Sequence, residues 1–168
     1  MNKIRDILCF STPYEEMYRI EDGLAGTIIY RDEELFEGIL TDQEYNDIYY
    51  IFGKKTNNEI DIIRSSKGDI ELPKLYHGKK ENKKYYGDIY VKNRFVEIPI
   101  GECQVSILNP ETCREINANE EKQLEKRISI LKNNLGEETI YLVEEMFKKE
   151  KENTKWFIFV FLSVILTM

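Results

Sequence analysis

Five carboxylates lie in stretches that alternate between apolar and polar residues, and they are the first candidates for chemistry. They are Glu37, Asp61, Glu71, Asp88 and Glu97. Two carboxylates that face each other across a pocket would suit the hydrolysis of a small polar substrate, as in a glycosidase. In an alternating sheet, however, the simpler interpretation is that these residues form the outward, solvated face. A carboxylate-based hydrolase is therefore the weakest of our three functional hypotheses.

His77 is the only histidine, so a Ser–His–Asp or Cys–His arrangement would have to use it. It stands in a predicted turn beside Gly78, and no nucleophile motif accompanies it. Cys9, Cys103 and Cys113 lack the spacing of a zinc site and are predicted to be free thiols. The glycines match no phosphate-binding loop. We therefore predict no catalytic residue, no metal ligand and no cofactor, and expect that the chain is not an enzyme.

Tyrosine is frequent in this chain, with 11 residues. Its side chain joins an apolar ring to a polar hydroxyl, which suits a ligand cavity or a protein interface. The candidate ligand-binding residues are Tyr49, Tyr50, Tyr85, Tyr86 and Tyr90. The simpler explanation is that tyrosine is common in β-strands. The expected partner is thus an unidentified small ligand or a protein.

Basic residues gather between Lys74 and Arg94, where seven bases stand against two acids and alternate with aromatic residues. Basic grooves with aromatic rings bind single-stranded nucleic acid. The chain as a whole has a net charge of −7, so nucleic acid is not the expected partner. A solvated hairpin tip is the simpler interpretation, and beside a bilayer these lysines would face anionic headgroups.

The last 13 residues of the sequence, WFIFVFLSVILTM, contain no charged residue and follow a stretch rich in lysine. A Trp that begins an apolar run after lysines is typical of a membrane interface with the lysines on the cytoplasmic side. The residues expected to reach the membrane are Lys155, Trp156, Phe157, Phe159, Phe161 and Leu162. Thirteen helical residues rise about 20 Å, less than the roughly 30 Å of a hydrocarbon core. Burial in a protein core is the alternative.

The elements that would position these residues follow from periodicity. Strict alternation with β-branched and aromatic residues predicts an antiparallel meander that forms a barrel or a sandwich. The predicted strands are residues 26–31, 35–41, 47–53, 59–65, 70–76, 84–92, 94–100 and 102–108. The predicted core of the last strands is Ile89, Val91, Val96, Ile98, Ile100, Val105 and Ile107. Eight strands followed by a helix resemble lipocalin-like barrels in layout alone.

Helical patterns flank the predicted sheet. Residues 12–22 carry a capping box and predict a short helix. Residues 118–134 place apolar residues at helical spacing, and a second helix is expected at about 137–152, so that the two form a helical hairpin. The predicted organisation is a helical lead-in (1–25), an antiparallel β domain (26–110), a helical arm (117–153) and a hydrophobic tail (154–168).

Two functional hypotheses rank above the hydrolase. The first is a non-catalytic binding or interaction module that the tail holds at the cytoplasmic face of a membrane. The second is a soluble cytoplasmic structural or interaction protein whose tail is buried in its own core or in a partner's. Both expect the main domain in the cytoplasm, because Asp6 interrupts the apolar run that a signal peptide needs.

Overall fold

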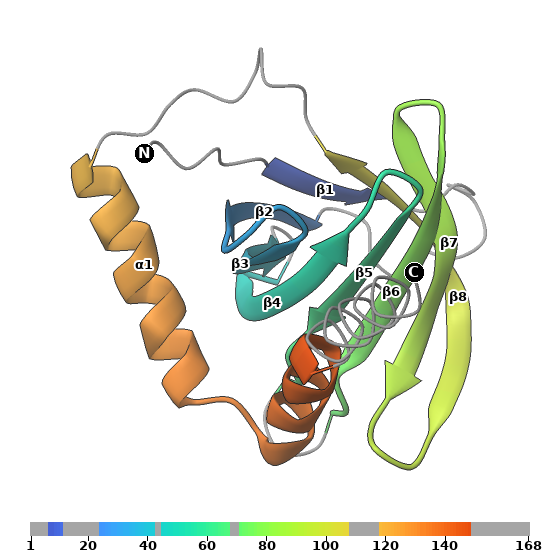
Figure 1. Ribbon diagram of the computed structural model, residues 1–168. Coiled ribbons are helices and arrows are strands. Elements are labelled where there is room, and N and C mark those ends of the chain that lie inside the picture. The colour runs from blue at the N-terminus through green and yellow to red at the C-terminus, as the bar shows by residue number, and fades with distance from the viewer. Residues whose placement is uncertain (1–6, 12–23, 43–44, 68–70, 108–117, 149–168) are drawn as a thin grey trace, which may run out of the picture.

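The computed structural model describes residues 7–11, 24–42, 45–67, 71–107 and 118–148, which form a mainly β structure with two helices (Figure 1). Its strands are β1 (Ile7–Ser11), β2 (Leu24–Tyr30), β3 (Leu35–Asp42), β4 (Asp47–Lys55), β5 (Glu59–Arg64), β6 (Lys74–Glu81), β7 (Lys84–Lys92) and β8 (Glu97–Ile107). The helices are α1 (Ala118–Asn133) and a second helix at residues 137–148.

Strands β2 to β8 form an antiparallel meander in which each strand pairs with the next along the chain. The short strand β1 pairs with β2 on one side and with β8 on the other. The prediction of a mainly β chain with antiparallel pairing and two C-terminal helices is therefore confirmed.

The inner face of the sheet carries a packed set of apolar side chains, which we call the interior cluster. Its members are Leu24, Ile28, Phe36, Leu40, Tyr49, Ile51, Ile60, Ile62, Tyr76, Tyr85, Ile89, Cys103 and Val105. The packing is tight, because a methyl group at Gly53 would collide with the ring of Phe36. All of these residues come from strands, so within the described part of the chain the sheet supplies this core.

Helix α1 lies against the outer face of the sheet and completes a second cluster, which we call the outer cluster. Its buried members are Ile29, Leu35, Ile39, Tyr50, Phe52, Leu124 and Ile128. Acidic residues stand in the first turn of α1 and a lysine in its last turn, as the helix dipole favours. The helices thus pack outside the sheet, which agrees with the prediction.

Three strand predictions need correction. Strand β1 lies in the segment predicted as a helical lead-in, and the sequence analysis missed it. The prediction of residues 77–83 as a turn is wrong, because β6 continues to Glu81 and a tight turn follows at Asn82, whose φ is 59°. The strands predicted at 94–100 and 102–108 are one strand, β8, whose register against β7 shifts next to Pro99.

The predicted core residues of β7 and β8 divide into four groups. Ile89 and Val105 are buried, as predicted, and Val91 and Ile100 are partly buried. The side chain of Ile107 lies outside the described part of the structure.

The prediction that Val96 and Ile98 are buried is wrong, since their exposed fractions are 39% and 51%. The reason is the length of the β7–β8 hairpin. The amide of Lys92 bonds to the carbonyl of Pro73, just before β6 begins, so the residues beyond Lys92 have no neighbouring strand in β6. Alternation continues there, but no core lies beneath it.

Two predictions fall outside the described residues: the helix at 12–22 and the hydrophobic tail at 156–168 with Lys155 before it. Among the helices that the structure does describe, none has the length and apolar character needed to span a bilayer.

Candidate ligand-binding groove

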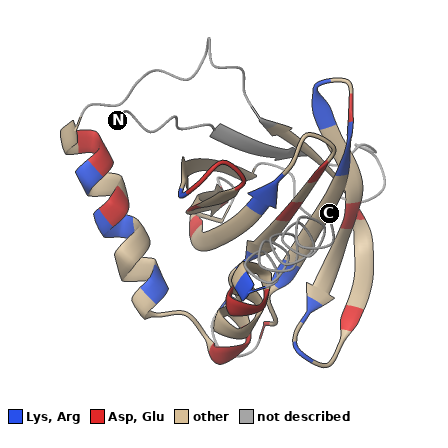
Figure 2. Cartoon of the chain, viewed as in Figure 1, with Lys and Arg blue, Asp and Glu red and all other residues tan. Residues whose placement is uncertain are grey.

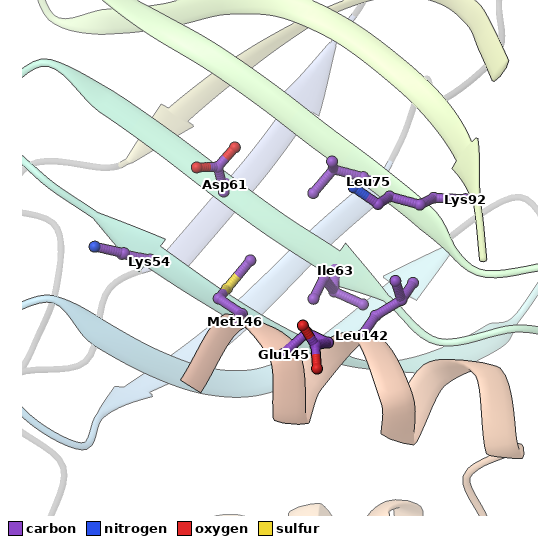
Figure 3. Close-up of a pocket in the computed structure, with 8 residues that line it drawn as sticks. All are labelled: Lys54, Asp61, Ile63, Leu75, Lys92, Leu142, Glu145 and Met146. Atoms are coloured by element: carbon purple, nitrogen blue, oxygen red, sulfur yellow. The ribbon is translucent and has the colours of Figure 1, made fainter. Parts of the chain in front are cut away.

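A cavity of about 290 Å³ lies between the outer face of strands β4 to β7 and the helix at 137–148 (Figure 3). The side chains that line it are Lys54, Asp61, Ile63, Leu75, Lys92, Leu142, Glu145 and Met146. Four of these are apolar, two are basic and two are acidic. The cavity is therefore an amphipathic groove at the surface, distinct from the interior cluster.

Alternation and helical spacing bring these side chains together. Asp61 and Ile63 are two residues apart in β5, so both point to the outer face of the sheet. Leu142 and Met146 are four residues apart, so they share one face of their helix. Neither pattern alone predicts the groove, because the groove exists only where the helix packs over these strands.

Contacts at two points of the sheet fix the start of the helix. The Nε atom of Arg94, in the β7–β8 turn, lies 3.3 Å from a carboxylate oxygen of Glu138, and its guanidinium stacks 4.7 Å from the ring centre of Tyr141. The amide of Ser66, after β5, donates a hydrogen bond of 3.2 Å to the hydroxyl of Thr139. The helix is thus held at two points of the sheet.

His77 lies next to the groove, in β6. Its Nδ1 atom is 2.5 Å from Oδ1 of Asp61, which lines the groove, and on the other side it pairs in register with Asp88 of β7. This contact fixes the orientation of the imidazole ring. A Ser–His or Cys–His pair would also need a hydroxyl or a thiol, and none of the lining side chains carries one.

Glu37 is the one candidate carboxylate that is buried, with an exposed fraction of 5%. Tyr50 Oη donates to it at 2.6 Å and Arg31 Nε at 2.7 Å, while Lys132 Nζ of α1 lies 3.2 Å away. Burial acts to raise the pKa of Glu37, but the hydrogen bond from Tyr50 and the charges of Arg31 and Lys132 together hold it below its usual value. Glu37 is therefore an ionised anchor and is poorly suited to donate a proton.

The remaining carboxylates are spread over the molecule. Glu71 pairs with Arg64 at 2.7 Å, and Glu97 pairs with Lys92 at 3.3 Å. Of the five carboxylates that the sequence singled out, Asp61 is the one that lines the groove. The structure therefore brings no two of them together there.

The five candidate tyrosines do not meet in one cavity. Tyr49 and Tyr85 belong to the interior cluster, and burial raises the pKa of both. Tyr50 lies in the outer cluster, beneath α1. Tyr86 and Tyr90 stand on the opposite face of β7 from Tyr85 and are exposed and partly buried, respectively.

The groove residues that sequence reasoning missed are mostly apolar: Ile63, Leu75, Leu142 and Met146. Their signal in the sequence is that of ordinary core positions. Across the described ranges, no three His, Cys, Asp or Glu side chains are arranged so as to hold a metal ion. Comparison with family models, with characterised proteins and with solved structures gives no significant match.

Proposed function

We propose that this chain is a non-catalytic binding module that residues 156–168 hold at the cytoplasmic face of a membrane. The observation that carries the proposal is the 13-residue stretch without a charged residue, preceded by lysines at 148, 149, 151 and 155. Lysines before an aromatic, apolar run are typical of the cytoplasmic boundary of a membrane segment. The described members of the interior cluster all come from strands.

We infer that the sheet closes into a barrel. The pairing of β1 with both β2 and β8 supports this inference. A closed sheet has no free edge strand at which a second chain could add. With the interior occupied by packed side chains, a ligand has to bind on the outside of the barrel.

The groove beneath the helix at 137–148 is the surface that we expect to bind. Its volume is near the lower limit of small-molecule pockets, which begin at about 300 Å³. Lys54 and Lys92 balance Asp61 and Glu145 in the lining, so the groove suits a ligand that joins a charged or polar group to an aliphatic or aromatic part. We therefore expect a small amphipathic ligand, or a protein segment with that chemistry.

Deleting residues 154–168 tests the membrane tether. We expect the full chain in the membrane fraction of lysed cells and the truncated chain in the supernatant, with an unchanged melting temperature. A full chain in the supernatant, together with a truncated chain that melts much lower, would instead support the alternative of a tail buried in the protein core. Sedimentation of both chains with membranes at 0.5 M salt, which screens charge attraction, would refute the tether.

The groove is tested with a probe of the expected chemistry, 4-phenylbutyrate, and the full chain in nanodiscs. Saturation transfer to the probe is expected, and Leu75→Glu should abolish it by placing a carboxylate in the groove. Ile98→Glu is the matched control, because Ile98 is exposed on the β7–β8 hairpin and outside the groove. Equal signals from both variants would contradict the assignment of the groove.

A further inference from the structure

Two neighbouring hairpins gather lysines at one end of the sheet. In a meander the turn after β4 and the turn after β6 lie at the same end, and the amide of Lys80 bonds to the carbonyl of Asn58 at 2.7 Å. We call this surface the basic face (Figure 2). Its lysines are Lys54, Lys55, Lys79, Lys80, Lys83 and Lys84.

The basic face has a strong local excess of charge. Residues 54–59 and 79–84 together carry six lysines and two glutamates, a net charge of +4, in a chain whose total is −7. The β2–β3 turn at the same end, residues 31–34, has a net charge of −2, and its Glu34 lies 3.8 Å from Lys54. The four lysines of the β6–β7 hairpin are exposed. The tight turn at Asn82 keeps these four lysines within one short hairpin tip.

The helix at 137–148 runs toward the basic face. Near its start, Glu138 is bound to Arg94 in the β7–β8 turn, at the end of the sheet opposite the basic face. Near its end, Met146 lines the groove together with Lys54, which belongs to the basic face (Figure 3). Lys148 is exposed and is the last residue described. The end of this helix therefore lies closer to the basic face than its start does.

We propose that the basic face docks on the anionic surface of a lipid bilayer and orients the sheet above it. This inference rests on the proposed function, because the tether brings the basic face to the membrane. Each lysine close to an anionic membrane strengthens binding by roughly fivefold, and salt screens this attraction. Four exposed lysines on one hairpin thus strengthen binding to the anionic membrane considerably, and this contribution depends on salt.

Single-stranded nucleic acid is the other polyanion that such a surface could meet. A bilayer is favoured because the sequence carries an apolar run at 156–168 preceded by lysines, whereas the overall charge of −7 opposes nucleic acid.

The experiment uses the full chain, made by cell-free synthesis with vesicles present and then floated. Vesicles of phosphatidylcholine alone are compared with vesicles containing 30% phosphatidylserine, at 0.1 M and 0.5 M salt. The test variant is Lys79→Gln/Lys80→Gln/Lys83→Gln/Lys84→Gln. The control removes the same charge from exposed positions elsewhere, as Lys67→Gln/Lys122→Gln/Lys126→Gln/Arg127→Gln.

At low salt we expect the unmodified chain and the control to bind phosphatidylserine vesicles at least 20-fold better than neutral ones. We expect this preference to vanish at 0.5 M salt and in the test variant. A test variant that keeps the preference for phosphatidylserine would overturn the inference. If that variant also loses binding to a single-stranded RNA probe, the basic face binds nucleic acid instead. If the chain needs phosphatidylserine to float at all, the basic face stands and the tether fails.

Discussion

At the scale of single residues, Glu37 shows how this protein stabilises a buried charge. Its carboxylate accepts hydrogen bonds from Tyr50 and Arg31 and faces Lys132, while Arg31 also holds Glu125 of α1 through two bonds of 2.6 and 2.8 Å. A buried carboxylate is tolerated only when such partners replace water. The network therefore joins the sheet to α1 at one defined position.

Glu37→Gln should lower the free energy of unfolding by about 2–3 kcal/mol, because charged hydrogen bonds are lost and Arg31 and Lys132 keep an uncompensated charge. Glu125→Gln, which breaks a more exposed pair with the same arginine, should cost less than about 1 kcal/mol. Urea denaturation of both variants measures the difference. Equal losses would show that Glu37 is not the anchor.

The same carboxylate gives the stability a pH dependence. Because folding lowers the pKa of Glu37 below the usual 4.5, its stabilisation is present above that pH and is lost as the pH falls through the pKa of the folded protein. The difference in unfolding free energy between the unmodified chain and Glu37→Gln should therefore narrow below pH 4.5. A difference that stays constant down to acid pH would exclude this linkage.

At the scale of elements, the attachment of α1 to the sheet depends on the outer cluster. Ile128 of α1 has an exposed fraction of 1%, whereas Ile130, two residues later, has 54%. The same substitution of isoleucine by alanine can therefore be made at a buried and at an exposed position of α1.

Ile128→Ala should lower the free energy of unfolding by about 2–4 kcal/mol through lost burial and the cavity that remains. Ile130→Ala is the matched control and should change it by less than about 0.5 kcal/mol. Thermal and urea unfolding measure both. If the two variants lose similar stability, α1 does not pack on the sheet as described.

Strand β7 and helix α1 could be predicted because their patterns are long. Tyr85 and Ile89 lie on the inner face and Tyr86 on the outer face, as alternation over nine residues indicates. The end of β6 was missed because Gly78 and two lysines are typical of turns, although here they extend a hairpin beyond its neighbours. Strand β1 has five residues, too few for a periodic signal.

The groove could not be predicted from the sequence for a different reason. Its residues are 92 positions apart at the extremes, from Lys54 to Met146, and alternation assigns each only to a face. Their meeting depends on Arg94 holding Glu138 and on Ser66 bonding to Thr139, which are contacts between distant elements. Local patterns carry no information about such contacts.

At the scale of the whole molecule, the groove and the basic face lie next to each other, because Lys54 belongs to both. The helix at 137–148 covers the groove, and its Met146 lines the groove together with Lys54. We therefore expect the groove to lie near the membrane surface when the protein is tethered. A ligand or partner that is itself at the membrane would meet it there.

The most direct test of the tether is a single charge inside the proposed membrane segment. Phe161→Lys should reduce flotation of the full chain on neutral vesicles at 0.5 M salt by roughly 100-fold, because a lysine within the hydrocarbon region costs about 2.5–3.5 kcal/mol. Phe161→Leu keeps the segment apolar and should float like the unmodified chain. Flotation of Phe161→Lys at the unmodified level would contradict the account.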